Sequence, residues 1–232
     1  MRNKFDMQLD SLKEQLTNMG ELCEVAITKA TEAILEGKEE QAREVILADE
    51  EIDQAEKDIE RLCLKLLLQQ QPVAKDLRQI SAALKMITDM ERIGDQASDI
   101  AEILLSTDLK MEMNNKDIGV MAQAAAKMVR ESVRAYVEQN MMLAKKVMTA
   151  DDEVDRLFDK IRQEIIEYIA KENGDGGEDA VDLIMVAKYL ERIGDHATNI
   201  AEWVEFSVTG NHRIATEVHE RKSAGEVKWF FV

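Results

Sequence analysis

The chain has 232 residues, enough for one or two domains with a substantial buried core. Its composition, with 1 proline, 10 glycines and 4% aromatic residues, favours an all-helical protein over a sheet protein. The formal net charge of −17 excludes nucleic-acid phosphates and anionic lipid head groups as primary ligands, because both would be repelled. Such a charge suits cations or a basic protein surface instead.

No targeting or membrane-spanning pattern is visible. Residues 1–6 have no apolar stretch behind their charges, which predicts that there is no signal peptide. The strongest apolar run, 62–68, contains Lys65 and is too short to span a bilayer. Cys23 and Cys63 lie among apolar neighbours, and buried free thiols are favoured over a disulfide. We therefore expect a soluble, cytoplasmic protein without direct membrane insertion.

Helix breakers divide the first half of the chain into three segments. A first helix is predicted from about residue 5 to Gly37. A second helix, 39–70, ends before Pro72, because proline cannot donate the helical hydrogen bond and clashes with the preceding turn. A third helix, 74–105, ends at a polar Ser-Thr-Asp sequence.

The second half follows the same plan, and a glycine-rich stretch at 173–177 separates its last two helices. Those three helices are predicted to span 117–139, 141–172 and 178–208. The chain is thus divided into a first repeat at 1–110, a linker at 111–116, a second repeat at 117–210 and a tail at 211–232. The tail contains Trp-Phe-Phe-Val and either packs on the body of the protein, frays, or docks on a partner.

Two segments of the chain occur twice in the sequence. The sequence Glu-Arg-Ile-Gly-Asp at 91–95 returns at 191–195, and Ala48–Asp53 is matched by Ala150–Asp155. Because both blocks recur in the same order at nearly the same offset, the chain is interpreted as a duplicated unit of roughly 100 residues. Three long helices joined by short loops pack as an up-down-up bundle. The predicted fold is therefore all-α, a tandem pair of three-helix bundles related by a pseudo-twofold axis.

Each copy carries acidic side chains spaced four residues apart on two of its helices. Residues at this spacing share one face of a helix, and here that face is separate from the apolar stripe that must pack in the core. Like charges at this spacing repel by about a few tenths of a kcal/mol per pair, a cost that a divalent or trivalent cation would remove. Ligands that are all oxygen atoms favour Mg²⁺, Mn²⁺, Ca²⁺ or iron, and they do not match a Cys/His zinc site. The alternative to a metal site is an acidic helix face exposed to solvent. The candidate metal ligands are Asp49, Asp53, Glu91, Asp95 and Asp99 in the first copy and Asp151, Asp155, Glu191, Asp195 and Asn199 in the second.

Other residues of the repeated segment have simpler interpretations. Gly94 and Gly194 lie in mid-helix, where glycine is costly, and they predict a close approach of two helices. Arg92 and Arg192 are expected in structural salt bridges, with anion binding as the alternative. His196 is expected to be a partly buried polar residue and not a metal ligand, because glutamine takes its place in the first copy.

With its doubled Glu-Arg-Ile-Gly-Asp segment and upstream Asp-x-x-x-Asp, the chain resembles the PhoU family of bacterial phosphate-uptake regulators over residues 5–212. The resemblance implies two three-helix bundles and a metal-binding surface built from Glu/Asp-x-x-x-Asp motifs. Iron or zinc clusters are known in the family, and magnesium or manganese has also been associated with it. The motifs match Asp49 with Asp53 and Glu91 with Asp95 and Asp99 in one repeat, and Asp151 with Asp155 and Glu191 with Asp195 in the other. Asn199 stands where Asp99 does in the first copy, which predicts a weaker second site or one with a different metal, because a neutral amide binds cations less strongly.

The resemblance also implies a function, the negative regulation of the phosphate-starvation (Pho) response and of phosphate transport. The family is thought to link the ATPase of the phosphate ABC transporter to the phosphate-sensing histidine kinase, so we expect recruitment to the membrane through these partners. The favoured interpretation is a metal-binding adaptor without catalytic residues. The alternatives are an accessory protein of a low-affinity phosphate permease and a carboxylate-bridged metalloenzyme. The sequence has no Glu-x-x-His pair and no glycine-rich phosphate loop, which argues against the metalloenzyme. The oligomeric state is left open, with a homodimer among the alternatives.

Overall fold

The computed structural model describes residues 2–70, 72–107, 116–171 and 176–211. Nearly all of the predicted linker and the tail from residue 212 lie outside these described residues. The described chain contains no strand and consists of six helices, which confirms the all-α prediction. The helices are α1 (Arg2–Glu36), α2 (Glu39–Gln70), α3 (Ala74–Ser106), α4 (Lys116–Glu138), α5 (Met141–Lys171) and α6 (Gly177–Thr209).

The helix ends follow the breakers in the sequence. Gly37, between α1 and α2, has φ +66°, a left-handed conformation that glycine adopts without steric cost. At the end of α6, Gly210 has φ +80° and donates its backbone N–H to the carbonyl of Phe206 at 2.8 Å. Between α4 and α5, the side chain of Asn140 accepts a hydrogen bond from the backbone N–H of Leu143 at 3.1 Å, which caps the start of α5. The predicted ends therefore agree with the observed ones to within a few residues.

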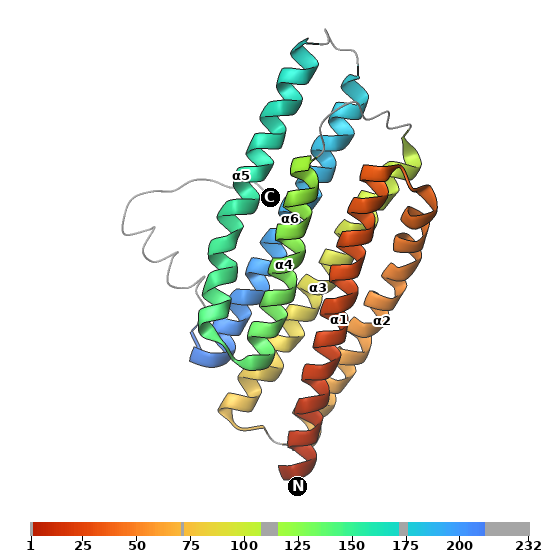
Figure 1. Ribbon diagram of the computed structural model, residues 1–232. Helices are drawn as coiled ribbons and strands as arrows, with labels where there is room; N and C mark the ends of the chain where they lie inside the picture. Colours follow the sequence, from red (N-terminus) through yellow and green to blue (C-terminus); the bar gives the residue numbers. More distant parts are fainter. Residues whose placement is uncertain (1, 71, 108–115, 172–175, 212–232) are drawn as a thin grey trace.

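The six helices form two three-helix bundles packed side by side and related by a pseudo-twofold axis (Figure 1). Helices α1 to α3 make the first bundle and α4 to α6 the second. Contacts between the bundles join α3 to α6 and α1 to α4, while α2 and α5 lie on the outer flanks. The surfaces between α2 and α3 and between α5 and α6 are therefore equivalent in the two copies.

One apolar core runs through both bundles. The apolar stripes of α1 and α4 contribute fully buried side chains such as Leu16, Met19 and Val129. The surface where the two copies meet, with α3 against α6 and α1 against α4, is called the seam. There the hydroxyl of Tyr136 on α4 donates a hydrogen bond to the backbone carbonyl of Gln79 on α3 at 2.8 Å, so a buried polar group is paired. None of the helices in the described ranges combines the length and the hydropathy that a bilayer crossing needs.

The two cysteines are buried and free, as predicted. The Sγ of Cys23 contacts the backbone carbonyl of Met90 at 3.3 Å. Burial raises the pKa of the Cys23 thiol to about 12, and burial does the same for Cys63. Both thiols are therefore packing groups and not thiolate ligands.

Candidate metal centre

The glycine of the repeated motif lets two helices of each copy approach closely. A Cβ atom on Gly94 of α3 would lie 2.7 Å from Oδ1 of Asp49 and 3.0 Å from Cδ1 of Ile52, both on α2. In the second copy, a Cβ atom on Gly194 of α6 would lie 3.3 Å from Oδ1 of Asp151 on α5. The same contact recurs in both copies, which confirms the predicted close helix approach. It also places an aspartate over bare helix backbone at the floor of each acidic surface.

The first acidic site consists of Asp49, Asp53 and Glu56 on α2 and Glu91, Asp95 and Asp99 on α3. Partial burial raises the pKa of Asp49 to about 6, and the nearby charges of Asp95 and Asp53 add to the shift. Partial burial also raises the pKa of Glu91, again with a contribution from Asp95. Carboxylates that raise one another's pKa lie close together. The structure thus brings the first set of predicted residues into one cluster, which Glu56 joins.

Two cations lie at the solvent-exposed rim of the first acidic site. The guanidinium of Arg92 lies 3.1 Å from Asp95 and 3.5 Å from Glu91. The ammonium of Lys57 lies 3.4 Å from Asp53, one turn away on the same helix. These side chains are more than half exposed, so the ion pairs are weak in water. Arg92 therefore forms the salt bridges that were predicted for it.

The second acidic site consists of Asp151 and Asp155 on α5 and Glu191 and Asp195 on α6. Partial burial raises the pKa of Asp151 to about 6, with further contributions from Asp195 and Asp155. Partial burial and then Glu191 raise the pKa of Asp155. Oδ1 of Asp151 is buried and has no hydrogen-bond partner among the described residues. Four of the five predicted residues of the second copy therefore also form one cluster.

The lysine of the second acidic site lies on a different helix from that of the first. The first site has Lys57 on α2 and Thr88 on α3, and the second has Asp159 on α5 and Lys188 on α6 at the equivalent positions. The ammonium of Lys188 pairs with the carboxylate of Glu191 and lies 5.4 Å from the ring centroid of Phe158. Its charge lowers the pKa of Asp155 and of Asp195, which their carboxylate neighbours raise. An ammonium group of the chain itself thus lies among the carboxylates of this site.

The last predicted ligand of each copy faces the seam between α3 and α6. The side-chain amide of Asn199 donates to Oδ1 of Asp89 at 3.1 Å, and Nδ1 of His196 lies 2.9 Å from the same oxygen. In the equivalent place, Tyr189 lies close enough to Asp99 to lower its pKa, which burial and other carboxylates raise. Asp99 and Asn199 therefore join the two copies, and His196 is the partly buried polar residue that was predicted.

Three residues of this surface were not found by sequence reasoning. Lys188 had a detectable signal, because it precedes Glu191 by three residues on one helix and such pairs face each other. Asp89 and Tyr189 act on the opposite copy and become neighbours of Asn199 and Asp99 only through the antiparallel pairing of α3 with α6. No local spacing reveals such contacts.

The donor set suits a hard cation, although the side chains are not arranged around one point. Within the described residues, no group of three or more histidine, cysteine, aspartate or glutamate side chains is placed so as to hold one ion. All the clustered donors are carboxylate oxygens, which Mg²⁺, Mn²⁺ and iron accept. The space that a Cβ of Gly94 would fill is occupied by Oδ1 of Asp49, so one donor is already held at the floor.

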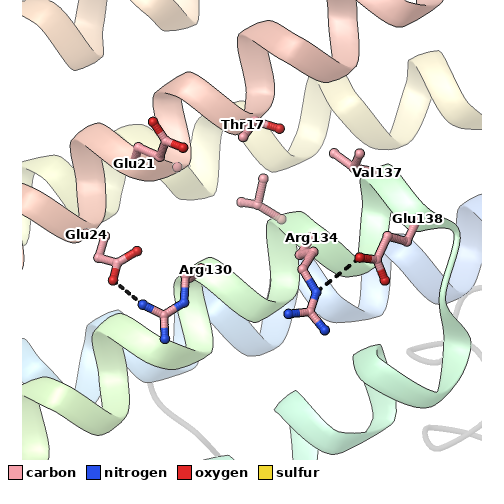
Figure 2. Close-up of a pocket in the computed structure, with 9 residues that line it drawn as sticks. Thr17, Glu21, Glu24, Arg130, Arg134, Val137 and Glu138 are labelled. Carbon is pink, nitrogen blue, oxygen red and sulfur yellow. Dashed lines mark hydrogen bonds and ion pairs between the residues drawn. The ribbon is translucent and has the colours of Figure 1, made fainter.

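A groove between α1 and α4 is separate from both acidic sites. It has a volume of about 310 Å³ and an apolar floor that includes Gly20. Figure 2 shows Arg130 facing Glu24 across the groove, and Arg134 facing Glu138 along α4, where the pair is 3.2 Å apart. Both guanidinium groups already have carboxylate partners, so the groove is not a site for a free anion.

Comparison with known proteins gives the family. The family model described as the PhoU domain matches twice, at residues 16–104 and 118–204, which confirms the duplication. The phosphate-specific transport system accessory protein PhoU homolog of Clostridium acetobutylicum is 36% identical over 213 residues, covering 90% of this chain and 96% of the relative. The homolog of Aquifex aeolicus is 41% identical over 193 residues, covering 82% and 86%. The crystal structure of PhoU from Pseudomonas aeruginosa superposes with a TM-score of 0.84 at 32% identity, covering 89% of this chain and 100% of that one. The chain belongs to the PhoU family.

Proposed function

We propose that this protein is an accessory protein of a phosphate-specific transport system and a negative regulator of the phosphate-starvation response. The names of the relatives, which describe accessory proteins of such a system, support the transport part. In this proposal the protein is an adaptor without catalytic activity, located in the cytoplasm. It contacts the ATPase of the phosphate ABC transporter and the phosphate-sensing histidine kinase, and reaches the membrane through them.

The observation that carries the proposal is the pair of acidic sites on the surfaces between α2 and α3 and between α5 and α6. An aspartate that lies over a glycine and has a pKa of about 6 is costly to keep charged, and both copies contain one. Groups that are held at such a cost commonly serve binding or chemistry. A bound cation removes this cost and gives a defined charge and shape to a surface that partners contact.

We further propose that the cation is bound by these carboxylates. At the first acidic site Asp49, Asp53, Glu91 and Asp95 would hold it, and at the second Asp151, Asp155, Glu191 and Asp195. The resemblance to the family favours iron or zinc, and the oxygen-only donors also suit magnesium or manganese. The ion would supply positive charge and orient carboxylates.

A charge-removing double substitution tests the metal part of the proposal. Asp53→Ala/Glu91→Ala should lower the metal content of protein purified from metal-replete cells and leave the helical content unchanged, because neither side chain is in the core. The matched control is Glu40→Ala/Asp58→Ala, which removes two exposed carboxylates outside both acidic sites and should leave the metal content unchanged. The same metal content in the wild type and in the first variant would contradict this assignment.

A deletion strain tests the regulatory part. Cells without this protein should express alkaline phosphatase in abundant phosphate, and the wild-type chain should restore repression. The tagged protein should recover the transporter ATPase and the kinase from phosphate-rich cells. Normal repression in the deletion strain, together with recovery of neither partner, would refute the adaptor function.

A further inference from the structure

The groove between α1 and α4 is a hollow to which the proposed function gives no role. Its floor lies where the two helices approach most closely, since a Cβ atom on Gly20 would lie 3.2 Å from Cγ2 of Val133. Val137, one turn further along α4, is partly buried and extends this apolar floor. The volume of about 310 Å³ is at the lower end of the range for ligand sites, so the groove suits a large side chain or a short peptide segment.

The rim of the groove places guanidinium groups above the apolar floor. Arg130 pairs with Glu24 across the groove, and Arg134 pairs with Glu138 along α4 (Figure 2). Both arginine side chains are more than half exposed. A guanidinium group whose N–H groups are paired with a carboxylate still presents a flat face, and this face stacks well on aromatic rings. An apolar floor beneath two arginines therefore favours an aromatic side chain as the occupant.

The tail, residues 212–232, has the matching chemistry. It lies outside the described residues, and both matches to the PhoU domain end before it. The whole chain has 2 tryptophans and 5 phenylalanines, and three of these residues are consecutive in the tail as Trp229, Phe230 and Phe231. Lys228 directly precedes them, and its charge is opposite to that of the exposed Glu21 on the groove rim.

The tail starts beside one end of the groove. Glu138 lines that end, and the side-chain amide of the next residue, Gln139, lies 3.5 Å from the hydroxyl of Ser207 in the last turns of α6. Trp229 follows Asn211 by 18 residues. A segment of this length spans roughly 20–25 Å on average as a random coil and about 60 Å when extended. The groove is only about two helical turns long, roughly 12 Å, so the aromatic residues can reach all of it from their own chain.

We propose that residues 228–231 of the tail dock in the groove between α1 and α4 of the same chain. An aromatic ring then covers Val133 and Val137 beneath the arginines, and the ammonium group of Lys228 lies near Glu21. Docking removes apolar surface of both the groove and the tail from water. Attachment to the same chain gives the tail an effective concentration of about a millimolar, so even a weak site is occupied. The docked tail acts as an autoinhibitory contact, which closes the groove to aromatic segments of other proteins.

Tryptophan fluorescence tests the proposal in the full chain. Trp203→Phe leaves Trp229 as the sole tryptophan. The emission of Trp229 should be shifted to the blue of that of a free peptide with the sequence of residues 221–232, and acrylamide should quench it less, because a docked ring is shielded from water. Val137→Lys in the same background places an ammonium group in the groove. It should shift the emission and the quenching of Trp229 to those of the free peptide.

A matched lysine substitution on the same helix is the control. Val120 is an exposed valine of α4 that does not line the groove, so Val120→Lys should leave the fluorescence of Trp229 unchanged. Thermal unfolding followed by circular dichroism verifies that each variant is folded. The inference would be overturned if Trp229 of the parent chain behaved like the free peptide, or if Val137→Lys and Val120→Lys gave the same fluorescence.

Competition separates docking within one chain from docking between chains. The chain shortened to residues 1–211 retains all six helices and should bind a labelled peptide of residues 221–232. The full chain should bind this peptide at least about tenfold more weakly, because its own tail already occupies the groove. Sedimentation velocity should give the same assembly state with and without the tail. Equal binding of the peptide by both chains, or a dimer that dissociates when the tail is removed, would overturn docking within one chain.

Discussion

The two acidic sites share a floor and differ at the rim. In each, an aspartate lies over the glycine of the repeated motif, on the same pair of helices. Around this floor equivalent positions carry different residues: Lys57 corresponds to Asp159, Glu56 to Phe158, Thr88 to Lys188 and Asp99 to Asn199. The floor depends on close packing of two helices, where an added methyl group destabilises the fold by overpacking. The rim is in contact with water, where substitutions cost little, so differences in ligand binding between two copies of one fold collect there.

The floors themselves are not equally tight, and alanine substitutions measure the difference. Gly94→Ala places a Cβ 2.7 Å from Asp49 and 3.0 Å from Ile52, so side chains must move. We expect the free energy of unfolding to fall by about 1–2 kcal/mol, net of the roughly 1 kcal/mol that alanine contributes through helix propensity. Gly194→Ala meets its nearest atoms at 3.3 Å and should change the free energy of unfolding by less than about 0.5 kcal/mol.

Urea denaturation followed by circular dichroism gives both values under the same conditions. Alanine at position 94 should also weaken metal binding, since it displaces the Asp49 carboxylate. Equal destabilisation by the two substitutions would show that the floors are equivalent and that the measured contacts do not govern packing there.

The fold could be predicted from sequence because its determinants are local. Pro72 and the left-handed Gly37 stop helices wherever they occur, and the repeated Glu-Arg-Ile-Gly-Asp segment reports the duplication directly. The mid-helix Gly94 predicted a close contact, and the contact exists. Each of these signals acts within a few residues of the element that it defines.

The site could be predicted only in part. Spacing of four on a helix places Glu91 near Asp95, and the motif on the preceding helix supplies Asp49. The contacts across the seam, such as Asp89 with Asn199, depend on how two distant helices cross. The cation at the second acidic site was missed for another reason: Lys188 lies just outside the repeated segment, although its spacing of three residues from Glu191 is a local signal.

The pH dependence of stability should reflect the raised pKa of one aspartate in each acidic site. In the folded protein Asp49 and Asp151 each have a pKa of about 6, above the ordinary value of 3.8. The folded state therefore binds these protons more tightly than the unfolded chain, and the free energy of unfolding falls as pH rises from about 4 to about 6. Without metal, lowering the pH from about 7 to about 5 should stabilise the protein by up to about 1 kcal/mol per site, allowing for solvent screening.

Asparagine variants assign this pH dependence to each site. Asp49→Asn and Asp151→Asn should each remove part of the gain, as measured by urea denaturation with a chelator present, because other carboxylates such as Glu91 and Asp155 also have raised pKa values. If these carboxylates bind metal as proposed, saturating Mn²⁺ should reduce the gain, because a bound cation holds the carboxylates in their ionised form. Asp58→Asn, which replaces an exposed aspartate outside both sites, is the control. A profile that Mn²⁺ leaves unchanged would contradict metal binding by these carboxylates.

A smaller effect than that of Gly94→Ala is expected at the contact between α3 and α6, where equivalent positions of the two copies have different residues. Asn199→Asp restores the residue of the first copy but places a second carboxylate beside Asp89, whose Oδ1 lies 3.1 Å from the present amide. We expect a loss of about 0.5–1 kcal/mol, because like charges repel and the amide donor is gone. Adding Asp89→Tyr reproduces the pairing of Tyr189 with Asp99 and should recover most of that loss, although His196 then lacks its carboxylate partner. Urea denaturation of the two single variants and the double variant closes a double-mutant cycle, in which a favourable coupling of about 0.5 kcal/mol or more is expected. Simple additivity of the two substitutions would mean that these polar contacts contribute little to the packing of α3 against α6.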